Sequence, residues 1–449
     1  MKKFFILFFF GTFLFLSACK ESGVDEIVDD EEPSVLDPVE TLPPNASFTP
    51  AFEGQTRVAG MKTETEYTIL QLVRDAQLYK PWSFKFIAED KILLLQKDGV
   101  MRIISVDGNN VNLGAPLAGV PPVYFDEREL TSNNTYANAG LFDVVLDPDF
   151  ATNRLIYFSY SKGSGPSNRL TISKATLDVA GNRLTGVSEI YRVSHAHAGT
   201  SVYGGRLLFD RSGYLLVTTG DRNRDDSRYM AQNLNSTIGK ILRLDKEGNP
   251  APGNPFAGTP GALPEIWAAG IRSPLGITLH PTTGEIWESE NGPKGGDELN
   301  IIRSGANYGW PLISYGIQYD GTAIGRGIFQ IAGAVPPQYY FDANNLTGGG
   351  LSAGEGFEQP RYYWDPAVAP AGMTFYTSDV IPEWKDNLFI VTLAGQHLIR
   401  LKIQGDKVIG EERLMDKFGM RLRDIQQGPD GALYVVTDTK EGRIYRIGK

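Results

Sequence analysis

The sequence predicts an all-β, six-bladed β-propeller over residues 67–449. An apolar strand, a tight turn and a second apolar strand recur six times in this part of the chain. The content of 50 Gly and 27 Pro residues suits many turns, and the 11% of aromatic residues suits strands. Small repeated sheets cannot bury their faces alone, so they pack side by side in a ring. A two-sheet sandwich is the second architecture considered, and six similar units fit it poorly.

The six units each begin with an inner strand, and their wide spacing predicts long insertions in some blades. In chain order the strand pairs are 82–87 and 92–95, 141–146 and 155–160, 206–209 and 214–219, 275–279 and 285–288, 373–376 and 387–393, and 424–427 and 432–437. The strand at 67–73 is expected to complete the blade that ends with residues 442–447. This pairing would close the ring and remove exposed sheet edges.

The first 47 residues are expected to serve export and attachment rather than the fold. Two lysines precede an apolar run that is too short for a comfortable membrane span. The Leu16-Ser17-Ala18 sequence before Cys19, the single cysteine, resembles a bacterial lipobox. It implies a signal peptide over 1–18 and a lipid anchor on Cys19, in the periplasm or at the outer membrane or cell surface. Residues 19–47 are acidic and rich in proline, so we expect a disordered linker.

Charge and composition exclude several classes of protein. The net charge of −10 argues against nucleic-acid binding, which needs a basic surface. A single cysteine allows no internal disulfide framework, and four histidines are too few for a His-rich metal cluster. An anionic ligand would therefore need a local group of arginines.

The stretch from Glu290 to Tyr308 is the strongest candidate for a ligand site. It places acidic residues, a Gly-Pro pair and a Gly-Gly pair directly after an apolar strand. Calcium prefers six to eight oxygen ligands, which carboxylates, carbonyls and water supply. Asp297 and Glu298 can offer carboxylates, and the glycine-rich turn can aim carbonyls. The alternative is an ordinary polar loop with turn glycines.

A series of motifs identifies the chain as similar to a known family. The motifs are Asp147-Pro148-Asp149-Phe150, Gly204-Gly205-Arg206-Leu207, Thr219-Gly220-Asp221-Arg222, Gly239 to Leu244, Asn254-Pro255-Phe256, Arg272 to Gly276, Asn291 to Asn300, Asn307 to Pro311 and Arg421 to Asp424. Together they resemble the soluble glucose/sorbosone dehydrogenase family. The resemblance covers residues 67–449 and implies a six-bladed propeller that oxidises sugars with pyrroloquinoline quinone (PQQ) and calcium.

The same resemblance implies roles for individual residues. The implied calcium ligands are the backbone carbonyls of Gly292 and Pro293, together with Glu298 and Tyr308. The implied cofactor-binding residues are Arg272, Arg421, Arg423 and Asn138. The implied catalytic residues are Asp221, which would orient the base, and Arg272. The alternative for the arginines is pairing with nearby acids such as Asp424, and that for Asp221 is a plain turn.

The sequence departs from the family where activity would depend on it. The position of the catalytic histidine is Val202, which cannot accept a proton, and a lysine that contacts the cofactor in some members falls at Ala394. An asparagine common in the family is here Ser273. His195 and His197 lie shortly before Val202, and either could replace the base if the loop folds inward. The alternatives are two solvated loop histidines or a weak transition-metal site.

These observations favour a PQQ- and calcium-dependent oxidoreductase that acts on CH–OH groups of an aldose or related sugar. The alternative is a catalytically impaired propeller that retains calcium and binds a glycan or another protein at the cell surface. A hydrolase is a third class, but no carboxylate pair at a defined spacing supports it.

Overall fold

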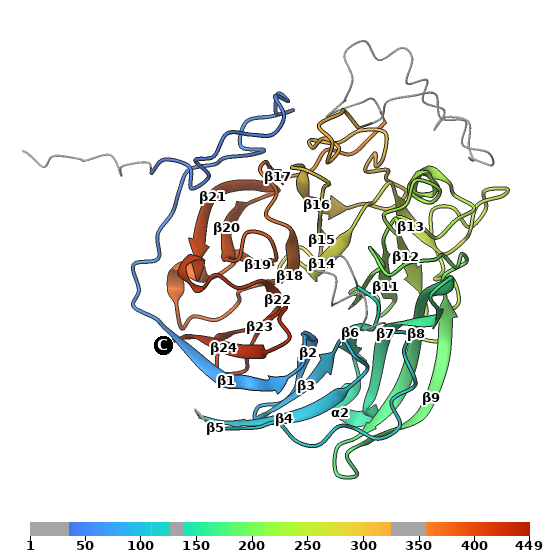
Figure 1. The fold of residues 1–449 in the computed structure, drawn as a ribbon, viewed down its shortest axis with the longest axis vertical. Coiled ribbons are helices and arrows are strands. Elements are labelled where there is room, and N and C mark those ends of the chain that lie inside the picture. Colours follow the sequence, from blue (N-terminus) through green and yellow to red (C-terminus); the bar gives the residue numbers. More distant parts are fainter. Residues whose placement is uncertain (1–35, 109, 126–137, 325–355) are drawn as a thin grey trace, which may run out of the picture. The chain divides into compact units, whose positions relative to one another are not determined.

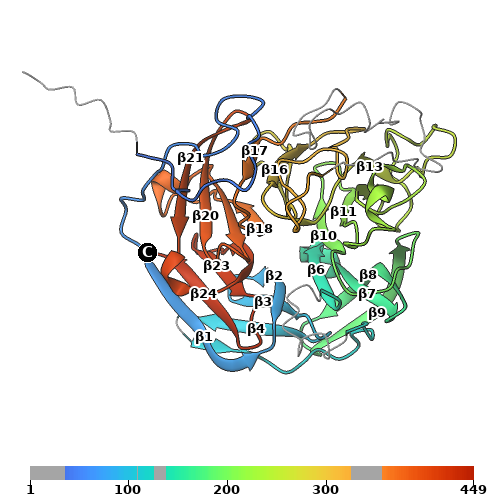
Figure 2. The same ribbon diagram turned by 45° about the horizontal axis from the view of Figure 1, so that its top comes forward.

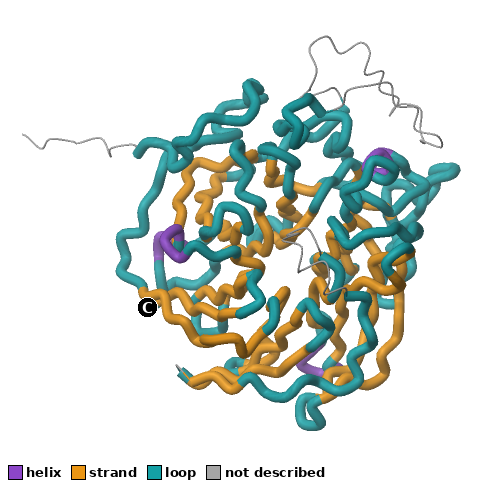
Figure 3. Tube along the Cα trace, in the orientation of Figure 1, coloured by secondary structure: helices purple, strands orange, loops and turns teal. Residues whose placement is uncertain are grey.

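The computed structural model describes residues 36–108, 110–125, 138–324 and 356–449. The predicted signal peptide and Cys19 lie outside this range. The described residues form six four-stranded antiparallel sheets, which confirms the predicted all-β, six-bladed propeller. Figure 1 shows the sheets arranged around a common centre, and Figure 3 shows that strands and loops make up nearly all of the described chain.

We number the six blades in chain order by their innermost strand. Blade 1 contains β2 (Pro81–Ala88), β3 (Lys91–Gln96), β4 (Met101–Asp107) and β5 (Asn110–Asn112). Blade 2 contains β6 (Leu141–Leu146), β7 (Leu155–Ser164), β8 (Ser167–Asp178) and β9 (Arg183–Arg192), with the short helix α2 (Phe150–Asn153) between β6 and β7. Blade 3 contains β10 (Gly204–Phe209), β11 (Leu215–Thr219), β12 (Lys240–Leu244) and β13 (Ile266–Ala269).

The second half of the ring follows the same order. Blade 4 contains β14 (Pro274–Leu279), β15 (Ile286–Glu290), β16 (Asp297–Ile302) and β17 (Tyr362–Trp364). Blade 5 contains β18 (Pro370–Phe375), β19 (Leu388–Thr392), β20 (Leu398–Gln404) and β21 (Lys407–Leu414). Blade 6 contains β22 (Leu422–Gln427), β23 (Leu433–Thr437), β24 (Gly442–Gly448) and β1 (Thr68–Leu78).

Blade 6 joins the two ends of the propeller domain. Strand β1 pairs antiparallel with β24, from Thr68 opposite Gly448 to Leu78 opposite Gly442. This pairing confirms the predicted ring closure. The inner strands of neighbouring blades contact one another around the whole ring, from β2 through β22 and back to β2.

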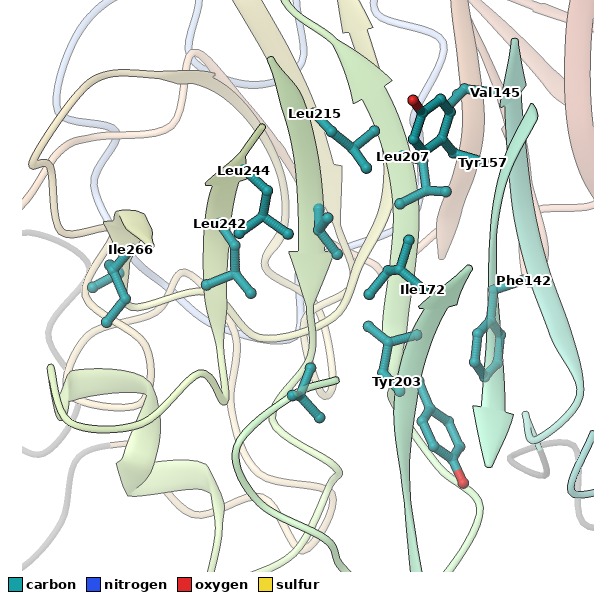
Figure 4. Packing of buried hydrophobic residues seen from close by; sticks show 14 of the residues in the cluster. Phe142, Val145, Tyr157, Ile172, Tyr203, Leu207, Leu215, Leu242, Leu244 and Ile266 are labelled. Carbon is teal, nitrogen blue, oxygen red and sulfur yellow. The ribbon is translucent and has the colours of Figure 1, made fainter. Parts of the chain in front are cut away.

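Apolar side chains fill the space between adjacent blades. Between blades 2 and 3, Phe142 and Tyr157 from one sheet lie against Leu207, Leu242 and other aliphatic residues from the next (Figure 4). Alternate residues of a strand point to the same face, so each sheet buries one apolar row on either side. Burial of these rows against the neighbouring blades is the main force that holds the ring together.

A buried ion cluster ties the inner strands together. Arg206 of β10 lies 3.0 Å from Asp424 of β22 and 3.6 Å from Asp143 of β6. Arg206 Nε also donates to the Leu275 carbonyl of β14 at 2.7 Å, and Asp143 accepts the Ser83 hydroxyl of β2 at 2.5 Å. The cluster therefore links five of the six inner strands. A cavity of about 320 Å³ beside it is lined by residues of all six.

The N-terminal segment from residue 36 to residue 66 runs along the outside of the sheets, above β21 and β17 in Figure 2. Arg57 donates to the carbonyls of Glu40 and Leu42, at 2.9 and 2.7 Å. The Asn45 amide donates to Asp365 of the blade 4 to blade 5 connection at 2.7 Å. The predicted disordered linker extended to residue 47, whereas residues 36–47 are held here by hydrogen bonds. Within the described ranges no helix has the length and apolar character needed to cross a bilayer.

Candidate functional site

One face of the ring collects the residues that follow the second strand of each blade. Each inner strand runs away from this face and its antiparallel partner returns to it. Lys97, Asp221, Asn291 and Asp438 therefore come to this face at the ends of β3, β11, β15 and β23. We call this face the mouth. Loops that gather at one end of a propeller are a common place for binding sites.

The loop between β15 and β16 is held in a fixed shape by Asp297. One carboxylate oxygen of Asp297 accepts the Gly292 N–H at 2.8 Å, and the other accepts the N–H groups of Val368 and Ala369 at 2.7 and 2.6 Å. Burial raises the pKa of Asp297 to about 6. Gly296 has a φ of 69°, and a Cβ there would lie 2.2 Å from the backbone of Gly316. Asp297 thus positions the loop instead of offering the carboxylate expected for a cation.

Three of the four predicted calcium ligands line one small void under this loop. Gly292, Glu298 and Tyr308 border it, together with Arg272, Glu290, Asn291, Gly296, Trp310, Ile313 and Ser314. Its volume of about 10 Å³ admits one water-sized sphere, which is the scale of a single cation. Pro293 does not line the void. The Tyr308 hydroxyl already donates to the Ile301 carbonyl at 2.7 Å, so a cation contact from this residue would use its carbonyl.

Four polar side chains form an oxygen-rich wall beside the void. Glu288 and Glu290 of β15 pair in register with Asn300 and Glu298 of β16, so all four side chains share one face of blade 4. Burial, reinforced by the charge of Glu290, raises the pKa of Glu288 and Glu298 well above the ordinary range. Burial also raises the pKa of Glu290 to about 7. Glu288 Oε1 and Asn300 Oδ1 are buried without a hydrogen-bond partner in the described structure.

These oxygens fit a hard cation, which takes carboxylates, amide oxygens and backbone carbonyls together. In the described parts of the chain, no three His, Cys, Asp or Glu side chains are grouped so that they could hold a metal ion by themselves. Loop carbonyls would have to complete the coordination. Sequence reasoning missed Glu288, Glu290 and Asn300. The signal was present, because alternate polar residues at 288 and 290 and at 298 and 300 fall on adjacent strands of one hairpin.

Arg272 precedes β14 and contacts the loop between β15 and β16, whereas the other two predicted cofactor-binding arginines contact Asp438. Its Nη1 donates to the carbonyls of Asn291 and Gly292 at 2.5 and 2.8 Å, and its backbone N–H donates to the Glu290 carboxylate. The guanidinium carbon lies 5.2 Å from the centre of the Trp310 ring. Arg272 thus occupies a carbonyl that was predicted to bind calcium. A cation at Gly292 would require this arginine to turn away, which would release its donors for another anion.

Arg421 and Arg423 meet at a single carboxylate in blade 6. Arg421 Nε and Arg423 Nη2 donate to Asp438 Oδ2 at 3.2 and 2.7 Å. The arginines therefore pair with an acid, as the alternative interpretation expected, but with Asp438 and not with Asp424. Arg423 Nε and Asp438 Oδ1 are buried and have no hydrogen-bond partner in the part of the chain that the structure describes. The Arg423 guanidinium stacks on Trp82 at 3.5 Å.

Asp221 is buried next to Val202, but its carboxylate serves a different partner. Asp221 Oδ2 accepts the indole N–H of Trp310 at 2.9 Å, and Oδ1 accepts the Asn223 N–H at 2.7 Å. Burial raises the pKa of Asp221. Val202 has a φ of 44°, in the left-handed region, and its carbonyl accepts the Arg222 N–H at 3.0 Å. A β-branched residue is strained in this conformation.

The two candidate histidines sit in the loop that leads into β10. His195 Nδ1 lies 2.7 Å from the Ser194 hydroxyl. The backbone of His197 exchanges hydrogen bonds of 2.9 and 3.0 Å with Asn168. Burial, followed by the charge of Arg222, lowers the pKa of His197 to about 4. The His197 Nε2 atom is buried and has no hydrogen-bond partner among the described residues.

The structure brings neither histidine to Asp221 through a hydrogen bond or ion pair between described residues. The rings of His195 and His197 lie 6.4 Å apart, and among the described residues they belong to no group of three His, Cys, Asp or Glu side chains that could hold a metal ion. Asn138, the predicted cofactor-side amide, lies beside the same loop because its N–H donates to the Thr200 carbonyl at 2.6 Å.

The fold and site define a six-bladed propeller whose mouth has a small void at the β15–β16 loop of blade 4 and two arginines paired with one carboxylate in blade 6. Residues 78–352 and 344–446 match the model of the glucose/sorbosone dehydrogenase family. The chain belongs to this family, as its motifs indicated.

Known relatives extend over most of the chain. The chain is 35% identical over 373 residues to the aldose sugar dehydrogenase YliI of Escherichia coli, covering 83% of this chain and 90% of that protein. It is 25% identical over 386 residues to the quinoprotein glucose dehydrogenase B of Acinetobacter calcoaceticus, covering 72% and 78%. A crystal structure of a glucose dehydrogenase superimposes with a TM-score of 0.73 at 36% identity, covering 85% of this chain and 99% of that one.

Proposed function

We propose that the protein is a PQQ- and calcium-dependent dehydrogenase that oxidises a hydroxyl group of an aldose or related sugar. The observation that carries this proposal is the division of the mouth. Blade 4 offers the oxygen-lined void at Gly292 and Glu298, and blade 6 offers Arg421 and Arg423. Such a division suits a ligand that chelates a cation at one end and carries carboxylates at the other. Family membership and the names of the relatives support the same reaction class.

Calcium would be held by the carbonyls of Gly292 and Pro293, the carboxylate of Glu298 and the carbonyl of Tyr308. The unpartnered oxygens of Glu288 and Asn300 would add negative potential behind it. When bound, the calcium–PQQ pair supplies a polarised quinone that accepts hydride.

The arginines would anchor the carboxylates of the cofactor. A guanidinium group binds a carboxylate through two parallel N–H donors, which fixes orientation as well as charge. Arg423 Nε has no partner among the described residues and is available for this contact. Arg272 would contribute after leaving the carbonyls of Asn291 and Gly292.

The site has no base at the position where removal of the hydroxyl proton is expected. A dehydrogenase of this kind needs a base for the hydroxyl proton, and Val202 stands where that base is expected. His195 and His197 are the candidate replacements. Neither is oriented by Asp221, so we expect slow turnover.

The test is reconstitution of the purified protein with PQQ and calcium, followed by dye reduction with a panel of aldoses. We expect slow, sugar-dependent reduction that requires both additions. Absence of dye reduction together with absence of PQQ binding in the absorbance spectrum would overturn the proposal.

A second function is favoured by Val202 and Ala394. In this alternative the propeller retains calcium and PQQ-site geometry but binds a surface glycan or another protein without oxidising it. Wild-type protein that binds PQQ and stays inactive with every sugar, but gains activity on Val202→His, would support this alternative. Wild-type activity abolished by His195→Ala or His197→Ala would rule it out.

We also propose that the protein is a lipoprotein anchored through Cys19, facing the periplasm or the cell surface. The Leu16-Ser17-Ala18-Cys19 sequence supports this location. Labelling of cells with a palmitate analogue should mark the wild-type protein and not a Cys19→Ser variant. Equal labelling of the two proteins, or none of the wild type, would contradict the anchor.

A further inference from the structure

A lysine at the mouth lies in the same charged group as the two arginines of blade 6. Lys97 follows β3 in blade 1 and is 1% exposed. Its Nζ lies 4.3 Å from the centre of the Trp82 ring, the same ring on which Arg423 stacks at 3.5 Å. Blades 1 and 6 are neighbours in the ring, so residues far apart in the sequence place two cations against one aromatic side chain.

Four cations act on one carboxylate at this place. Although burial alone would raise it, the charges of Arg423, Arg421, Lys97 and Lys80 lower the pKa of Asp438 to about 2. The Lys97 backbone N–H donates to the Lys80 carbonyl at 3.1 Å, which fixes the two lysines side by side. A buried lysine is costly unless an anion stabilises its charge.

The group also contains a donor that points to a ligand. Arg423 Nε is buried and has no hydrogen-bond partner among the described residues, although Arg423 itself is 2% exposed. Asp438 Oδ2 receives both arginine donors. This unpartnered N–H of Arg423 suits the carboxylate of an anionic ligand.

Ala394 removes a cation that the family resemblance expects at the mouth. Residue 394 follows β19 in blade 5, and residue 97 follows β3 in blade 1, so both sit at the same place in their blades. Lys97 of blade 1 can therefore supply a positive charge at the mouth. Ala394 of blade 5 supplies none.

We propose that Lys97 is a cofactor-anchoring residue that binds a carboxylate of PQQ together with Arg423. The inference rests on the proposed function, because PQQ is its ligand. It assigns Lys97 a contact that no motif in the sequence suggested. Lys97 acts in binding and takes no part in proton or hydride transfer.

The experiment measures the Kd for PQQ in the presence of calcium for wild type, Lys97→Met, Lys97→Arg and Lys85→Met. Methionine keeps the length of the side chain and removes its charge. Lys85 belongs to the inner strand of the same blade and lines the central cavity together with Asp143 and Asp424, so Lys85→Met is a matched control. Charged hydrogen bonds of this kind predict a Kd about 10- to 100-fold weaker for Lys97→Met. We expect partial recovery with Lys97→Arg and no change with Lys85→Met.

Two readouts separate failure of the inference from failure of the proposed function. Wild-type protein that does not bind PQQ would overturn the proposed function. Wild type that binds PQQ, with equal affinity in Lys97→Met, would overturn the assignment of Lys97 alone. The calcium-induced rise in Tm is expected to be the same in Lys97→Met and wild type, which checks that the mouth is still folded. Should Lys97→Met fail to fold, Lys97→Gln keeps a polar end, and an unchanged Kd in that variant would overturn the assignment equally.

Discussion

Replacement of Val202 by histidine tests whether residue 202 faces the reacting group at the mouth of the propeller. The backbone at residues 202–203 is hydrogen-bonded to residues 220 and 222, on either side of Asp221. A Cβ placed on Gly220 would lie 2.8 Å from Val202 Cγ1, so the side chain of residue 202 lies directly over the residue before Asp221. A histidine ring at position 202 would therefore extend beside the Asp221 carboxylate.

The expected magnitude follows from two effects. A positioned general base contributes about 10²- to 10⁴-fold to the rate, so Val202→His should raise kcat by that order. Asp221 can orient the new ring, because a carboxylate accepts about four hydrogen bonds and Asp221 accepts two from described donors, Trp310 and Asn223. The left-handed backbone at φ 44° favours histidine and asparagine over valine, by roughly 1–2 kcal/mol at most. Relief of that strain offsets the loss of buried apolar surface.

The assay is dye reduction by the PQQ- and calcium-loaded protein, with Val202→Asn as the matched control. Asparagine relieves the same backbone strain and supplies no base, so its Tm should follow that of Val202→His while its activity stays at the wild-type level. A Val202→His protein that binds PQQ as tightly as wild type and shows no gain in kcat would refute the reasoning. It would mean that residue 202 does not face the reacting group.

Three other predictions follow from buried charges. Glu290 has a folded-state pKa of about 7, raised by burial from an ordinary value near 4.5, so calcium-free protein should lose a few kcal/mol of stability as pH rises from about 4.5 through 7. Calcium should abolish this loss of stability in thermal melts. A calcium-free protein whose Tm rises over that pH range would contradict the burial of Glu290 in the oxygen-rich wall. Arg206→Met should cost about 3–5 kcal/mol in urea unfolding, because it leaves Asp143 and Asp424 buried without their partner; a cost under about 1 kcal/mol would contradict the ion cluster. His197→Ala should change sugar oxidation less than about threefold, since His197 makes no described contact with the acid expected to orient a base, whereas a loss of about 100-fold would identify it as that base.

The fold could be predicted from the sequence because each blade is a local unit. The strand pairs come from adjacent segments, and their turns carry Asp, Pro, Asn or Gly. The closing pair of β1 and β24 was also predictable, since an open ring would leave sheet edges unpaired. Order in residues 36–47 was not predictable from their acidic and proline-rich composition. It depends on distant partners such as Asp365 and Arg413, which no local pattern reveals.

The site was predictable in part for the same reason. Gly292, Glu298 and Tyr308 come together because one hairpin and its following loop carry them. The place of Glu288 and Glu290 in the oxygen-rich wall could not be predicted without the strand register, which fixes the faces on which alternate residues lie.

Contacts between blades lay beyond sequence reasoning. The charges of the two arginines of its own blade and of Lys97 of the next blade all act on Asp438, although residues 97 and 438 are far apart in the chain. The Trp310 contact of Asp221 likewise joins two different loops. Such pairs depend on how the ring closes, and composition or spacing carries no signal for them.

The most direct test of the central claim is an equilibrium titration of the purified protein with PQQ, with calcium in one arm and a calcium chelator in the other. The division of the mouth predicts saturable binding of one PQQ per chain that calcium strengthens and the chelator weakens or abolishes. It also predicts a rise in Tm when both ligands are present. Absence of saturable PQQ binding in either arm would contradict the account.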